Sequence, residues 1–156
     1  MVLFKGDYVE KIANDLNISK KVVDDVIGVY GVYIQNMLNA GKSMKFLNVC
    51  HINCENEDDY LNTMETLAYV ATDIANLLGI GSVTVQRIFS ALEDIIVDEV
   101  ASDNGFCLRG VVRIRCVKND EGERRVRVKK SVKYNGEPIR ISTFNSFRRK
   151  VEAYGR

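Results

Sequence analysis

The residues best placed to do chemistry are the lysines and arginines of the last fifty positions. Residues 107–156 hold 15 Lys/Arg and 5 Asp/Glu, a net charge of +10. Residues 1–106 hold 7 Lys/Arg and 16 Asp/Glu, a net charge of −9, so the overall +1 conceals a strong division. A basic segment attached to an acidic body is typical of a protein that meets a polyanion with one end of the molecule.

The candidate binding residues are the cations that an extended ribbon and the segment after it would present to phosphate groups. They are Arg113, Arg115, Lys118, Arg124, Arg125, Arg127, Lys129, Lys130, Lys133, Arg140, Arg148 and Arg149. Contacts of this kind set position and affinity more than sequence preference. If about six phosphates are engaged, the logarithmic salt dependence of binding is expected to have a slope of roughly −5. For Arg148 and Arg149, an ordinary solvated helix face is an equally good interpretation.

Four cysteines and one histidine raise the question of a metal. Zinc requires four converging thiolate or imidazole ligands. Cys50 and Cys54 share one face of a predicted strand and His51 lies on the other. Paired Cys-x-x-Cys spacing is absent, so we expect small core cysteines, reduced thiols and no metal site.

Catalysis has little support in the sequence. There is a single histidine, no glycine-rich phosphate loop and no nucleophile motif. We interpret Asp24-Asp25 and Asp58-Asp59 as helix-surface and linker charge rather than as a carboxylate pair. We therefore expect a protein that is not an enzyme, with no catalytic residues and no cofactor.

The elements that position these residues occur twice. At an offset of 62 positions, IANDLNI (12–18) aligns with IANLLGI (74–80), and apolar positions continue to match without a gap through Cys54 and Cys116. Such self-similarity indicates one supersecondary unit used twice.

The first copy predicts two helices. Asp7 followed by Glu10 has the spacing of a capping box and predicts a helix over 8–16. Ser19 is placed to cap a second, longer helix with apolar residues at helical spacing, and Gly41 stands where that helix should stop.

The second copy predicts the same pair. Asn62 and Glu65 form the expected capping box, with helices over 63–78 and 82–101. Both second helices are apolar around much of their circumference, which favours burial. We therefore expect the two copies to pack on each other within one chain.

Strands follow each helix pair, and only the second copy continues into a basic stretch. Met44 and Phe46 alternate with polar residues, and 123–130 alternates valines with cations. Turns are predicted at 119–122 and at Asn135-Gly136, and a terminal helix over 146–154.

This order of elements resembles the HU/IHF family of histone-like proteins. The matching segments are YVEKIANDLNISKKVVDDVI (8–27), GKSMKFLNVCHI (41–52), IANLLGIGSVTVQRIFSALEDII (74–96) and FCLRGVVRI (106–114). The resemblance implies an α+β fold in which two HU-like helical hairpins form an intramolecular pseudo-dimer, with one developed antiparallel sheet and arm and a short C-terminal helix. The expected domains are 1–54 (first half, without an arm), 55–62 (acidic linker) and 63–156 (second half).

The resemblance also implies a function. Family members wrap the minor groove of duplex DNA with β-arms, and residues 113–134 are expected to form such an arm. The family's Arg-Asn-Pro arm tip is absent here, and the only proline is Pro138. The expected partner is double-stranded DNA, bound without strong sequence preference by a monomeric pseudo-dimer or a homodimer.

An alternative remains open, because acidic side chains of the helical body would repel a duplex. In that case the same scaffold is a protein-interaction module that binds or antagonises nucleoid or transcription proteins. The sequence has no basic-then-apolar leader and no apolar run of membrane-spanning length. We therefore expect no membrane partner and a cytoplasmic, nucleoid-associated protein; its compact duplicated form would suit a phage.

Overall fold

The computed structural model describes residues 1–54, 65–131 and 139–153, and its helices recur at the 62-residue offset found in the sequence. Helices α1 (Lys5–Leu16) and α2 (Lys20–Asn39) recur as α4 (Leu67–Leu78) and α5 (Ser82–Ala101), with both ends of each helix displaced by 62 positions. Their turns recur as well. Asn17 and its counterpart Gly79 both cap a helix in the left-handed conformation, with φ of 54° and 67°.

The strands that follow obey the same offset. Strands β2 (Met44–Phe46) and β3 (Cys50–Cys54) form an antiparallel pair, as do β4 (Gly105–Leu108) and β5 (Val112–Lys118). Met44 lies opposite Ile52 in the first pair, and Phe106 lies opposite Ile114 in the second. The predicted duplication is therefore confirmed down to the strand register.

Both first helices begin at positions that differ from the prediction. Helix α1 begins at Lys5 rather than Tyr8. Asp7 is the third residue of the helix, and its carboxylate caps the helix by accepting the Phe4 N–H at 2.9 Å. The predicted box with Glu10 is therefore wrong. Helix α4 begins at Leu67, where the Thr66 hydroxyl accepts the Tyr69 N–H at 3.1 Å.

Ser19 caps α2 as predicted, accepting the Val22 N–H at 3.2 Å. The expected acidic linker, Asn62, Asn135-Gly136 and Tyr154 lie outside the described residues.

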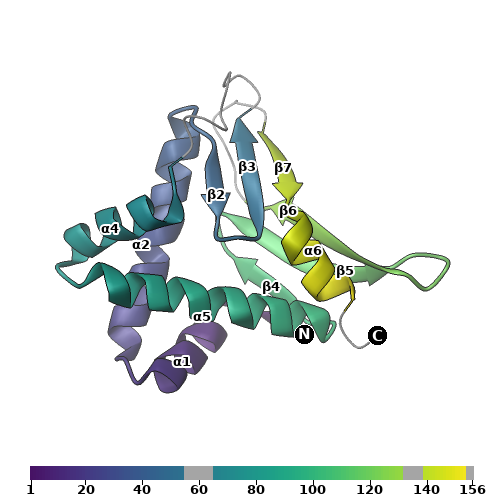
Figure 1. Ribbon diagram of the computed structural model, residues 1–156, viewed down its shortest axis with the longest axis horizontal. Helices are drawn as coiled ribbons and strands as arrows, with labels where there is room; N and C mark the ends of the chain where they lie inside the picture. Colours follow the sequence, from purple (N-terminus) through teal and green to yellow (C-terminus); the bar gives the residue numbers. More distant parts are fainter. Residues whose placement is uncertain (55–64, 132–138, 154–156) are drawn as a thin grey trace.

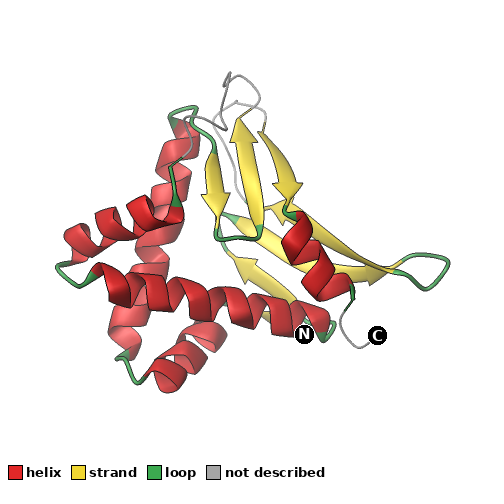
Figure 2. Ribbon diagram, in the orientation of Figure 1, coloured by secondary structure: helices red, strands yellow, loops and turns green. Residues whose placement is uncertain are grey.

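Two sheets form where one was expected (Figure 2). Sheet A has the order β1-β4-β5-β6, with β1 (Val2–Leu3) parallel to β4 and β6 (Arg124–Lys130) antiparallel to β5. Sheet B has the order β2-β3-β7, because β7 (Ile139–Thr143) pairs with β3 of the first copy. The single-sheet prediction is wrong for this reason: a strand far along the chain completes the sheet of the first copy.

One hydrophobic cluster joins the two copies. The equivalent positions Val23 and Val85 are both fully buried in it. Aromatic rings cross from one copy to the other: the Tyr30 and Phe89 ring centroids are 4.5 Å apart, and those of Phe46 and Phe106 are 6.3 Å apart. Neither copy covers its apolar face alone, so the two are stabilised together.

A second link between the copies is polar. The Tyr33 hydroxyl of α2 donates to Glu65 Oε2 at 2.6 Å and to Asp73 Oδ2 of α4 at 2.9 Å. Partial burial and these two carboxylates raise the pKa of Tyr33 far above its ordinary value, so the phenol stays a donor at all physiological pH values.

The β5–β6 hairpin extends away from the helices, and α6 (Asn145–Glu152) lies against it (Figure 1). Helix α6 buries Phe147 and Val151, as the sequence predicted, and contacts both α5 and β6. No helix in the described part of the chain is long and apolar enough to cross a membrane.

Candidate functional site

The outer surface of sheet A carries four cations arranged as two cross-strand pairs. Strand alternation buries Ile114 and Val126 and turns their neighbours outward. Arg113 lies opposite Lys129, and Arg115 lies opposite Arg127. All four side chains are exposed. We call Arg113, Arg115, Arg127 and Lys129 the cationic face.

No acidic side chain among the described residues neutralises the cationic face. None of its four members takes part in an ion pair with a described residue, whereas Arg124, Arg125 and Arg148 nearby do. Like charges directly opposite on neighbouring strands destabilise a sheet by about 0.2–1 kcal/mol per pair. The arrangement therefore costs stability, and an anion bound there would relieve the repulsion.

The cationic face borders a cavity of about 300 Å³. Lys130, at the end of β6, joins the four cations in lining it. Its remaining lining comes from Val2 of β1, Gly105 and Phe106 of β4, and Ile114 of β5. A group of anionic oxygens placed in this cavity would meet cations from both strands of the hairpin at once.

Arg124 belongs to the core of the hairpin and not to its surface. Its Nη2 donates to the Ala101 carbonyl at 2.5 Å and contacts Asp103 Oδ1 at 3.1 Å, at the carboxyl end of α5. The side chain is only 15% exposed. A cation at this position satisfies carbonyls that the helix leaves unpaired and complements the helix dipole, so Arg124 is placed for stability.

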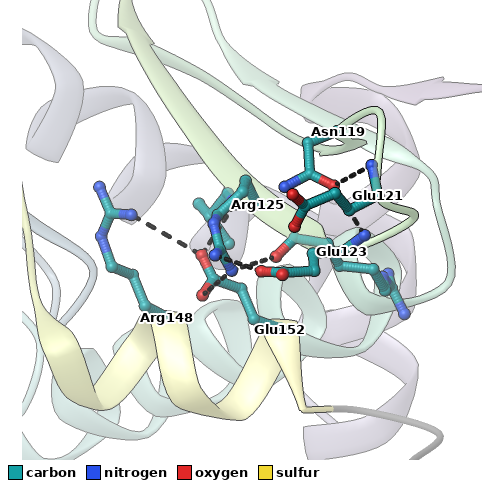
Figure 3. A network of polar contacts seen from close by, with 8 residues as sticks. Asn119, Glu121, Glu123, Arg125, Arg148 and Glu152 are labelled. Carbon is teal, nitrogen blue, oxygen red and sulfur yellow. Dashed lines mark hydrogen bonds and ion pairs between the residues drawn. The ribbon is translucent and has the colours of Figure 1, made fainter.

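Arg125 and Arg148 are tied into a network around Glu152 (Figure 3). Arg125 binds Glu123 at 2.5 Å and approaches Glu152 at 3.9 Å, while Arg148 lies 3.7 Å from Glu152. The Glu152 carboxylate also accepts the Val126 N–H at 3.1 Å. Helix α6 therefore braces β6 and engages both arginines.

The hairpin turn is acidic. The Asn119 side-chain oxygen accepts the backbone N–H groups of Glu121 and Glu123 at 3.0 and 2.9 Å (Figure 3). Asp120 and Glu121 are exposed at its end. The turn predicted at 119–122 is confirmed, and it joins β5 to β6 in an antiparallel hairpin. Residues 132–134 of the predicted arm lie outside the described residues.

The remaining predicted cations are scattered. Lys118 is exposed at the end of β5 beside the acidic turn, and Arg149 is exposed on α6. Arg140 is exposed in β7, opposite Asn53 in sheet B. Lys133 lies outside the described residues. The structure thus gathers four of the predicted residues into the cationic face, with Lys130 beside it.

Sheet B has its own polar outer surface, which the sequence analysis did not single out. Lys45, His51 and Ser142 lie in register across its three strands. The Phe144 ring meets the His51 ring edge-on at 4.3 Å, and Lys45 Nζ lies 5.4 Å from the Phe144 centroid. Burial, with a contribution from Lys45, holds the pKa of His51 below its ordinary value. The alternation of apolar and polar residues along β2 and β3 could have predicted this polar surface from the sequence.

The cysteines sit in the hydrophobic interior. Cys50, Cys54 and Cys107 are buried and Cys116 is partly so. Burial raises the pKa of the Cys50 thiol to about 12, which keeps it protonated and unreactive at neutral pH. In the described ranges, no three Cys, His, Asp or Glu side chains converge as a metal site would require.

Comparison with known proteins adds no assignment: no protein-family model matches the chain, and no curated protein matches it.

Proposed function

We propose that the chain is a non-catalytic DNA-binding protein that contacts duplex DNA through the cationic face. The observation that carries the proposal is the pairing of Arg113 with Lys129 and of Arg115 with Arg127 on an exposed sheet surface, where no described acidic side chain pairs with them. Cations at strand spacing meet phosphates of a duplex backbone, which supply affinity independent of sequence.

We further propose that the two copies form an HU/IHF-like intramolecular pseudo-dimer. Support comes from the exact recurrence of helices and strand register at 62 positions and from the hydrophobic cluster common to both copies. Strand β7 gives the first copy a third strand, as β6 does for the second. A role on DNA would make the protein nucleoid-associated.

The mode of binding proposed here differs from the arm-and-wedge mode of that family. Asp120 and Glu121 at the end of the hairpin would be repelled by phosphates. The hairpin's edge strand is held by Glu152 of α6. The duplex therefore lies along the cationic face rather than being gripped by the turn, and bending is expected to be modest.

A matched pair of variants tests this proposal by fluorescence anisotropy on a labelled duplex. Arg115→Gln/Arg127→Gln removes two charges from the cationic face. Lys42→Gln/Arg87→Gln removes two exposed charges from the helical body. We expect the first variant to weaken binding by about tenfold or more and the second to have little effect. Equal losses in both would contradict a localised interface.

The protein-interaction alternative is favoured by a different observation. Leu77 and Val83, which flank the turn between α4 and α5, are 70% and 67% exposed. Large exposed apolar side chains close together are typical of protein contacts. Failure of the parent chain to bind duplex DNA in dilute salt would favour this second function over the first.

A further inference from the structure

The cavity beside the cationic face has features that a duplex backbone does not use. At about 300 Å³ it is at the small end of the range for small-molecule sites, and a duplex is far too wide to enter it. Five cations line it: Arg113, Arg115, Arg127, Lys129 and Lys130. So many positive charges around so small a space suit an anion whose negative charges are equally concentrated.

Strand β1 lies beside β4 in the sheet of the second copy and contributes to the lining of this cavity. Strand β1 approaches closely since residue 105 is glycine: a Cβ there would lie 3.1 Å from Val2 Cγ2. The corresponding surface of sheet B offers Lys45, His51 and Arg140 instead. Strand β1 and the cations of the β5–β6 hairpin therefore build the concave cationic site on the sheet of the second copy.

The chemistry of the lining narrows the ligand. Arginine presents a planar fork of donors that matches phosphate oxygens two at a time, and Arg115 and Arg127 face each other across the strands. Phosphates joined in a short chain would place several charges within reach of both. Val2 of β1, which is 37% exposed, gives the cavity an apolar wall, against which a flat ring can rest.

We propose that this cavity binds a compact polyphosphate group, as carried by nucleoside di- and triphosphates, and that such a ligand competes with DNA for the cationic face. The competition rests on the proposed DNA function, because the same four cations serve both. Binding of the ligand itself is independent of it.

Isothermal titration of the full chain with ATP, inorganic tripolyphosphate, adenosine and orthophosphate tests the site directly, without DNA. We expect ATP and tripolyphosphate to bind at one site per chain and adenosine and orthophosphate to bind far more weakly. Tighter binding of ATP than of tripolyphosphate assigns the apolar wall to the base; equal affinity assigns the site to the phosphates alone. Either supports the proposal.

Three double variants test whether the arginines of the cavity are responsible. Arg115→Gln/Arg127→Gln should lower ATP affinity about 100-fold, from about tenfold for each lost charged hydrogen-bonding group. Arg149→Gln/Lys150→Gln removes the same charge from exposed positions of α6 outside the cavity and should change it little. Arg115→Lys/Arg127→Lys keeps the charge but loses the forks, so reduced affinity in a folded variant supports phosphate recognition by arginine.

The proposal is overturned if ATP does not bind at millimolar concentration, or if both neutralising variants lose affinity equally. DNA binding without ATP binding rejects this inference and leaves the proposed function standing. ATP binding without DNA binding supports the cavity as a ligand site and rejects the DNA function. Where both bind, ATP should raise the apparent dissociation constant for DNA.

Discussion

Two arginines three positions apart in the same strand should respond to mutation in opposite ways. We compare Arg124→Met with Arg127→Met, because methionine keeps the apolar stem while removing the charge and the donors. Arg124 is 15% exposed and joined to the end of α5, whereas Arg127 is exposed opposite Arg115. Sequence alone gives both the same role, so the comparison separates the structure from the charge pattern.

The expected magnitudes follow from the contacts. Arg124→Met removes donation to the Ala101 carbonyl and the contact with Asp103, and should lower the free energy of unfolding by about 2–3 kcal/mol. Arg127→Met removes no hydrogen bond or ion pair that the structure shows and relieves repulsion from Arg115. Its effect should stay within about 0.5 kcal/mol, on the stabilising side.

Urea denaturation followed by far-ultraviolet circular dichroism measures both changes, since the chain has no tryptophan. DNA binding by the folded fraction should show the reverse order, with Arg127→Met impaired and Arg124→Met near the parent. A stable Arg124→Met protein, or equal destabilisation by both changes, would refute the assignment of Arg124 to the end of α5.

Three further predictions concern the core and sheet B. Tyr33→Phe should lower the free energy of unfolding by about 1–2 kcal/mol, because two neighbouring carboxylates lose their shared donor; denaturant titration checks this. Because the pKa of His51 is lowered in the folded state, its contribution to stability is present above the unfolded pKa and is lost as pH falls through about 6.5 towards the folded value. His51→Gln should therefore flatten the loss of stability between pH 7 and 5, and an unchanged profile would contradict the pKa assignment. Native thiol labelling should modify the partly exposed Cys116 first, and Cys50 only at the rate of opening, since it is buried with its pKa raised to about 12; mass spectrometry of labelled peptides identifies the order.

Much of the secondary structure could be predicted from the spacing of apolar residues along the chain. Helical spacing and the 62-residue repeat predicted α2 and α5, and the end of each helix, because those features depend on neighbouring residues. Alternation over 123–130 likewise predicted that Val126 and Val128 face one way and the cations the other. Val126 is buried, Val128 is partly buried, and Arg127 and Lys129 are exposed.

Long-range pairing was the part that the local pattern did not contain. Strand β7 joins β3 across almost ninety positions, as in the pairing of Ile52 with Ile141, and nothing near either segment specifies its partner. Strand β1 is two residues long and has no periodicity to detect.

The same limit explains the candidate site. Charge and spacing predicted twelve cations as DNA-binding residues, but the sequence did not indicate which side chains each of them would contact. Arg124 has its role because the carboxyl end of α5 lies beside it, and Arg125 because Glu152 of α6 does. Segregation into structural and surface cations depends on tertiary contacts, which act through residues distant in the sequence.

The salt dependence of duplex binding by the parent chain tests the central claim most directly. Four engaged phosphates predict a slope of about −3.6 for the logarithm of the association constant against that of salt concentration, and Arg115→Gln/Arg127→Gln should reduce its magnitude by about 1.8. A slope near zero, or one that this double variant leaves unchanged, would contradict DNA binding by the cationic face.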